Sequence, residues 1–235
     1  MIICYSFSRP LKRIVPDLLG FGGTAPWAGA DSLSHDHNAE LVAAVLSAEV
    51  SGPIDVVGHS YGGAAALRLA ALYPECMRSL VLIEPIVTSL LREAKDPLAE
   101  ESNRFANEFI ALVGDGKTEA AWRHFFDGRG TPGRWAATSD RSKARFQTMT
   151  AQTVAGFGAN LTVRQTLADC RQIAVPTTIA RGSDTAAWDV RIAEILCELL
   201  PTAPFHIVEG AGHMSPLTHP EVIARIIDGH LAWCR

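Results

Sequence analysis

The chain has 235 residues, of which 48% are hydrophobic and 20% are charged, and its formal net charge is −4. This size and composition suit one globular α/β domain with room for an inserted subdomain. The weak negative charge gives no reason to expect nucleic acid or an anionic membrane as a partner. No apolar run approaches the roughly 20 residues that a membrane-spanning helix needs, so no membrane association is expected.

The cysteines are scattered, odd in number and show no C-x-x-C spacing: Cys4, Cys76, Cys170, Cys197 and Cys234. This usage predicts reduced thiols and no metal site. The first seven residues lack a basic region, and their apolar run is too short for a signal peptide. We therefore expect a cytoplasmic protein.

Short apolar runs alternate with helical patterns along the chain, which predicts βαβ units around a mostly parallel sheet. The expected strands are 13–15, 54–57, 80–83, 177–180 and 205–208. The expected helices outside the middle third are 37–48, 61–72, 190–200 and 220–232, and Asp36 is the expected cap of the first helix.

The middle third, from Pro85 to about Thr166, has no strand-like run. Its patterns predict helices at 97–113, 118–126 and 141–155, with a glycine-rich loop at 128–133. We expect a helical cap insert at 85–166, lying over an α/β core made of 1–84 and 167–235. Trp122 and Trp135 are candidate substrate-pocket residues, although packing of the insert onto the core explains each aromatic equally well. Its arginines Arg123, Arg129 and Arg134 are expected to be solvated.

A Gly-x-Ser-x-Gly motif stands at residues 58–62, between an expected strand and an Ala/Leu-rich helix. This setting is typical of a nucleophile elbow, a sharp turn that exposes the serine hydroxyl at the sheet edge. We expect Ser60 to adopt a strained backbone conformation, and Gly58 and Gly62 to avoid collisions across the turn. The following helix N-terminus favours negative charge at Ser60.

A nucleophilic serine needs a base, and a carboxylate to orient that base. Of the eight histidines, only His213 lies in a small-residue loop directly after a core strand. His59 lies inside the elbow, where it is expected to point away from the serine hydroxyl. His35 and His37 form a His-x-His pair, which a polar helix start explains better than a metal site.

At this point the chain resembles the α/β-hydrolase superfamily. Four motifs carry the resemblance, in the family's order: Val15–Gly22, Gly58–Gly63, Leu82–Pro85 and Gly210–His213. The resemblance implies an α/β-hydrolase fold in which the insert is the cap domain, Ser60 is the nucleophile and His213 is the base. A serine nucleophile argues against dehalogenases and epoxide hydrolases, which use aspartate there.

Two residues are candidates for the carboxylate that orients His213. The family usually places it three residues after a glycine that follows the penultimate strand, but the third residue after Gly182 is Thr185, and Asp184 is one position early. Some members use a carboxylate after the strand that follows the nucleophile helix, where this chain has Glu84. We favour Glu84 slightly and keep Asp184.

The start of the chain also departs from the family. The usual His-Gly loop, which donates one oxyanion N–H, has no match before Arg13, and residues 1–7 offer at best an edge strand with Ser6 near the histidine position. Only the N–H of Tyr61 is assigned as an oxyanion donor. We expect either weak activity or a homodimer that covers the unpaired sheet edge.

These features predict a serine hydrolase that cleaves carboxylic esters of small molecules through an acyl-enzyme, without a cofactor. The enzymatic alternative is C–C bond or lactone hydrolysis by the same residues. The alternative from another class is a catalytically weak member that binds a ligand or partner.

Overall fold

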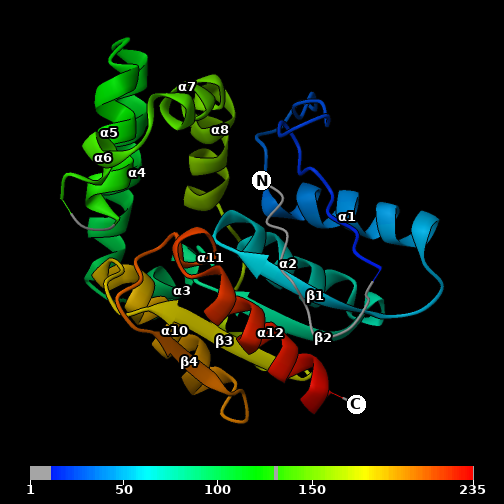
Figure 1. The fold of residues 1–235 in the computed structure, drawn as a ribbon. Coiled ribbons are helices and arrows are strands. Elements are labelled where there is room, and N and C mark those ends of the chain that lie inside the picture. Colours follow the sequence, from blue (N-terminus) through cyan, green and yellow to red (C-terminus); the bar gives the residue numbers. More distant parts are fainter. Residues whose placement is uncertain (1–11, 130–131, 235) are drawn as a thin grey trace.

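The computed structural model describes residues 12–129 and 132–234. Within these residues, one four-stranded sheet has the order β1-β2-β3-β4, and all neighbouring strands are parallel. The strands are β1 (Ile54–His59), β2 (Met77–Ile83), β3 (Thr177–Gly182) and β4 (Phe205–Val208). Because parallel strands run in one direction, the carboxyl ends of all four lie at the same edge of the sheet (Figure 1).

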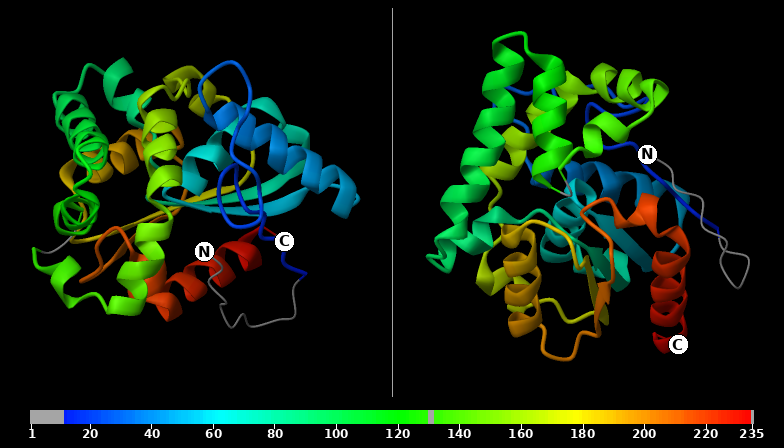
Figure 2. Two further views of the ribbon diagram at one scale, coloured as in Figure 1. Left: turned by 90° about the horizontal axis from the view of Figure 1, so that it is seen from above. Right: turned by 60° about the vertical axis from the view of Figure 1, so that its left-hand side comes forward.

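Helices cover both faces of the sheet, and β2 shows the division residue by residue. Leu80 and Leu82 belong to the apolar cluster that includes residues of α2 and α10, whereas Val81 and Ile83 belong to the cluster that includes α12. Figure 2 shows α12 on the face opposite α1 and α2. The helices of this core are α1 (His35–Glu49), α2 (Tyr61–Leu72), the 3₁₀ turn η1 (Pro74–Cys76), α9 (Leu167–Arg171), α10 (Ala187–Leu199), α11 (Ser215–Thr218) and α12 (Pro220–Trp233).

The four central strand predictions are confirmed, but the expected strand at 13–15 is wrong. Residues 12–18 have no regular secondary structure, and Val15 is exposed. Pro16 lacks a backbone N–H and cannot donate to a strand ladder, which explains part of this failure. Residues 1–7, expected to form an edge strand, lie outside the described residues. Within the described chain the outer edge of β1 is unpaired, and the homodimer remains a prediction.

The first helix begins two residues earlier than expected and has a different cap. Ser34 is the N-cap: its hydroxyl accepts a hydrogen bond from the His37 N–H, and the His37 side chain bonds back to the Ser34 N–H. Asp36 instead lies in the first turn and pairs with Arg68 at 2.6 Å. His35 and His37 are therefore parts of a helix start.

The middle third is helical, as expected, and we call residues 85–166 the helical insert. Its helices lie beyond the carboxyl ends of the strands (Figures 1 and 2). The single helix expected at 141–155 is two helices that meet at Met149, where Thr148 and Thr150 hydroxyls bond back to the carbonyls of the preceding turn. The insert contains α3 (Thr88–Glu93), α4 (Leu98–Gly114), α5 (Thr118–Gly128), α6 (Arg134–Ala137), α7 (Asp140–Thr148) and α8 (Thr150–Leu161).

None of the helices in the described ranges combines the length and the apolar character needed to cross a bilayer.

Candidate active site

Ser60 occupies a strained turn between β1 and α2. Its φ of 55° and ψ of −121° lie in a region that L-residues with side chains rarely adopt. The surrounding backbone holds it there: the Ser60 N–H donates to the Ile83 carbonyl at 3.0 Å, and the Ser60 carbonyl accepts from Ile86 at 3.2 Å. The strained conformation predicted for Ser60 is present, and the end of β2 maintains it.

The glycines around Ser60 have different roles from those expected. A Cβ at Gly58 would come within 2.7 Å of the Gly62 carbonyl oxygen, so Gly58 is required by close approach, as predicted. A Cβ at Gly62 would meet nothing within 4 Å, so that prediction is wrong. The second tight position is Gly63, where a Cβ would lie 2.8 Å from the Pro85 Cα. The elbow therefore packs directly on the chain that leaves β2.

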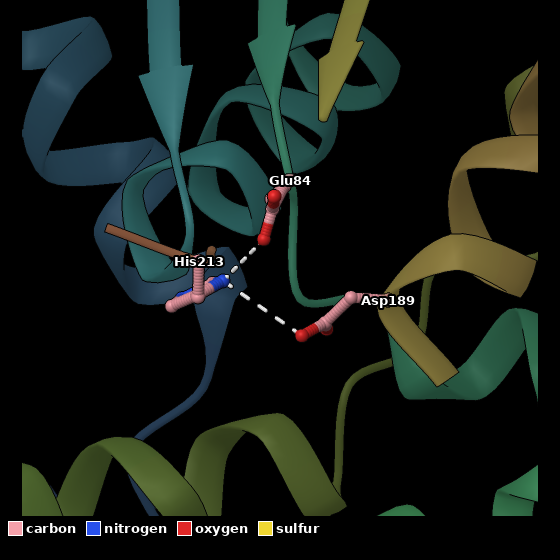
Figure 3. A group of neighbouring side chains, drawn as sticks. All are labelled: Glu84, Asp189 and His213. Atoms are coloured by element: carbon pink, nitrogen blue, oxygen red, sulfur yellow. Dashed lines mark hydrogen bonds and ion pairs between the residues drawn. The ribbon is translucent and has the colours of Figure 1, made fainter. Parts of the chain in front are cut away.

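Ser60, His213 and Glu84 form a continuous hydrogen-bonded row. The Ser60 Oγ lies 2.8 Å from His213 Nε2. On the other side of the ring, His213 Nδ1 lies 2.7 Å from Glu84 Oε2, a contact that Figure 3 shows. A carboxylate can only accept, so Nδ1 carries the imidazole proton and Nε2 is free to accept from the serine hydroxyl. This is the protonation pattern that a general base facing a serine requires.

Glu84 is held by donors from the end of β3. The residue directly follows β2, has a φ of 44° and is buried. Its Oε1 accepts from the Gly182 N–H at 2.6 Å, and its Oε2 accepts from the Thr185 hydroxyl at 2.8 Å. A Cβ at Gly182 would lie 2.0 Å from the Ala211 carbonyl oxygen, so only glycine lets the His213 loop approach here.

Asp184 lies apart from this row. It is exposed, and its carboxylate accepts from the neighbouring Ser183 hydroxyl at 2.7 Å. Its N–H bonds to the Ala211 carbonyl at 2.9 Å, which ties the turn to the loop that carries His213. Of the two candidate acids, the structure brings Glu84 to His213, as the expectation of a His213–Glu84 bond required, and it leaves Asp184 as a turn residue.

A second carboxylate near His213 was not anticipated from the sequence. Asp189 Oδ2 lies 3.7 Å from His213 Nδ1, and its carboxylate binds Arg129 Nη2 at 2.7 and 2.6 Å. Both side chains of this ion pair are buried, so the expectation that Arg129 is solvated is wrong. One signal was available: Asp189 precedes Ile192, Ala193 and Leu196 at helical spacing, which places a charge on the apolar face of α10.

Burial keeps the two central histidines neutral. Desolvation, followed by the positive charge of Arg129, lowers the pKa of His213 below its usual value of 6.5, while Asp189 opposes this shift. Burial also lowers the pKa of His59 to about 3. His59 Nε2 donates to the His213 carbonyl at 2.8 Å, so His59 supports the loop and does not approach Ser60 through this nitrogen, as predicted.

Tyr61 follows Ser60 and opens α2. The first N–H groups of a helix have no partner within the helix, so the Tyr61 N–H is available beside Ser60. The Tyr61 side chain is engaged elsewhere: its hydroxyl accepts from Asn38 at 2.8 Å, and burial raises its pKa to about 12. The backbone N–H of Tyr61 therefore remains the candidate donor to an oxyanion.

A narrow recess opens beside His213, between its loop and the helical insert. It encloses about 380 Å³ of space, part of it open to solvent. The residues that line it are Phe125, Phe126, Arg129, Arg134, Gly210, Gly212, His213 and Met214. Trp122 and Trp135, the expected pocket residues, do not line this recess: both are buried in the aromatic cluster inside the insert, with ring centroids 6.5 Å apart. Phe125 and Phe126 on α5 line the recess instead, in the position expected of the two tryptophans.

Glu84, Asp189 and His213 offer ligand atoms within 4.8 Å of one another, which is the spacing of a metal site. All of these atoms already have partners: Arg129 binds both Asp189 oxygens, and His213 Nδ1 bonds to Glu84. A guanidinium in the ligand shell repels a cation. The side chains therefore fit a proton-handling site better than a metal centre.

A sequence model described as the alpha/beta hydrolase family matches residues 4–226. The 2-hydroxymuconate semialdehyde hydrolase of Pseudomonas putida is 27% identical over 96% of this chain and 78% of its own length. Lipase LipV of Mycobacterium tuberculosis is 44% identical, but over only 35% of this chain and 32% of its own.

Among solved structures, a thermophilic esterase from Thermogutta terrifontis superimposes with a TM-score of 0.71, at 20% identity, over 93% of this chain and 79% of that one. This likeness concerns the fold.

Proposed function

The chain belongs to the α/β hydrolase family, and we propose that it is a serine hydrolase that cleaves carboxylic esters of small molecules. Ser60, His213 and Glu84 are the proposed catalytic residues. The single observation that carries the proposal is the row of two hydrogen bonds, 2.8 and 2.7 Å long, that joins these side chains at the carboxyl edge of the sheet.

The proposed reaction has two halves. The Ser60 Oγ attacks the ester carbonyl carbon while its proton passes to His213 Nε2, and the tetrahedral intermediate then collapses as the leaving alkoxide takes that proton. Water attacks the acyl-enzyme, again giving a proton to His213, and the carboxylic acid departs as the proton returns to Ser60. Glu84 holds the imidazole in the required tautomer and stabilises the imidazolium in both halves.

The Tyr61 N–H is the proposed donor to the oxyanion, supported by its position at the start of α2 next to Ser60. The helix dipole adds to this stabilisation because the negative charge develops at the helix N-terminus. The helical insert is the proposed cap, since its residues Phe125 and Phe126 line the recess beside His213.

A fluorophosphonate probe tests the proposal most directly, because it reacts with an activated serine without requiring the natural substrate. We expect labelling at Ser60 and turnover of p-nitrophenyl esters, with a short-chain and long-chain series to define acyl preference. Absence of both labelling and turnover would favour a ligand-binding protein over an enzyme.

C–C bond hydrolysis is the second candidate function. It is favoured by the 27% identity to a 2-hydroxymuconate semialdehyde hydrolase over nearly the whole chain, and by the buried Arg129 at the recess. The same serine, base and acid would act on a carbon leaving group. Turnover of a 2-hydroxy-6-oxo dienoate in preference to p-nitrophenyl esters would select this function.

A further inference from the structure

The proposed triad leaves one buried charged group beside the base unused. Asp189 reaches His213 from α10, whereas Glu84 reaches it from the end of β2 (Figure 3). Its Oδ2 lies 3.7 Å from His213 Nδ1, the same nitrogen that bonds to Glu84 at 2.7 Å. One imidazole N–H thus faces two carboxylates that come from different elements.

Arg129 fixes Asp189 in this position. Its Nη2 binds both carboxylate oxygens, and its guanidinium carbon lies 5.9 and 6.0 Å from the ring centroids of Phe105 and Phe125. These aromatic contacts belong to α4 and α5, so the arginine is positioned by the helical insert. The pair therefore connects the insert to the vicinity of the proposed base.

Burying an ion pair of this kind is costly, and apolar side chains of similar size would join α10 to the insert as well. A second ion pair, Arg191 with Asp96 at 3.0 Å, already joins α10 to the helical insert. This pair is more exposed, and within the described residues no histidine is paired with it. Attachment of the insert alone does not require a charge at position 189.

We propose that Asp189, held by Arg129, is a positioning residue that acts as a second carboxylate for His213. This proposal rests on the proposed function. When the imidazole takes the Ser60 proton, Glu84 and Asp189 both stabilise the resulting imidazolium, so the two acids partly substitute for each other. The three charges other than the imidazole sum to −1, and the imidazolium brings the cluster to neutrality.

Four groups face His213 from the surrounding elements: Glu84 after β2, Asp189 on α10, Arg129 after α5 and His59 at the end of β1. Asp189 favours the charged imidazole and Arg129 disfavours it. Removing the Asp189 charge takes away the first influence and leaves the second in place. The pKa of His213 is therefore lowered further, and the acid limb of the kcat/KM profile is expected at lower pH.

The test is a double-mutant cycle on p-nitrophenyl butyrate hydrolysis, with Glu84→Gln, Asp189→Asn and the double variant. We expect Asp189→Asn to lower kcat by about threefold to tenfold in the wild-type background. In the Glu84→Gln background, the factor by which Asp189→Asn lowers kcat should be at least about ten times larger. Asp189→Asn should also move the acid limb of the kcat/KM profile to lower pH, which a purely structural residue would not do.

Asp96→Asn is the matched control, because it removes a carboxylate that joins the same two segments away from His213. It should change activity by the same small factor in both backgrounds. If Asp189→Asn does not fold, the neutral pair Arg129→Gln/Asp189→Asn replaces it, and the larger loss in the Glu84→Gln background is still expected.

Equal factors for the position-189 variants in both backgrounds, or an unmoved acid limb for Asp189→Asn, would overturn the proposal. These results remain distinct from failure of the proposed function. In that case the unsubstituted protein would show neither Ser60 labelling nor ester turnover.

Discussion

The carboxyl edge of the sheet and the helical insert are built by different means. At the sheet edge, backbone geometry positions Ser60 and Glu84: both have positive φ, and Gly58, Gly63 and Gly182 permit main-chain contacts that a Cβ would block. In the insert, contacts between side chains hold the residues in place, through an aromatic cluster and the Arg129–Asp189 ion pair. The comparison indicates that the main chain sets the positions of Ser60 and Glu84, while groups that shape the recess are held by packing.

The largest expected effect is at Ser60. Ser60→Ala should reduce ester hydrolysis by about 10⁴-fold or more, because the variant loses the hydroxyl that is bonded to His213 Nε2. The unfolding temperature should change little, since the main-chain bonds of residue 60 do not involve its hydroxyl. Retention of most of the turnover in a folded variant would disprove the proposed nucleophile.

The next effect is at the acid. Glu84→Gln should lower kcat by a factor of up to about 10⁴, since a neutral amide neither fixes the tautomer nor stabilises the imidazolium as well. Asp184→Asn is the control and should cost far less, because its carboxylate contacts Ser183. A reversed order of the two losses would transfer the role to Asp184, and two mild losses would mean that neither is the acid.

In the insert, the structure separates Phe125, which lines the recess, from the expected pocket residue Trp135, which does not. Phe125→Ala should widen the recess and shift preference toward longer acyl chains by a few-fold, measured as the ratio of kcat/KM for two p-nitrophenyl esters. Trp135→Ala should instead destabilise the protein by about 3–5 kcal/mol, because this side chain is buried and does not line the recess. A chain-length shift in the Trp135 variant alone would contradict this division.

The smallest expected effect is on the free energy of unfolding, and it differs between two adjacent glycines of the elbow. Gly63→Ala should destabilise the fold by roughly 1–3 kcal/mol, because its Cβ would lie 2.8 Å from the Pro85 Cα. Gly62→Ala should instead add roughly 0.5–1 kcal/mol of stability, since Gly62 lies in α2 with free space around it. Urea unfolding of both variants measures the difference, and similar losses would show that the two positions are equally crowded.

The sequence by itself determined the central strands, the main helices and the identity of Ser60 and His213 as site candidates. These follow from short-range physics: apolar periodicity defines the elements, and a serine between two glycines at a strand–helix junction defines the elbow. The turn at Ser60 could be predicted because its strand, its glycines and its helix lie within a few positions, although bonds to Ile83 and Ile86 hold its conformation.

Only the tertiary structure decided between Glu84 and Asp184, because the His213–Glu84 bond joins residues 129 positions apart and its geometry depends on how β3 and the His213 loop pack. The same holds for Arg129 and Asp189, whose charges are buried only because α5 and α10 meet. The tertiary structure also decided that Phe125 lines the recess and Trp135 does not, because this depends on the direction in which each side chain leaves its helix. Contacts between distant segments depend on packing, which local sequence patterns do not encode.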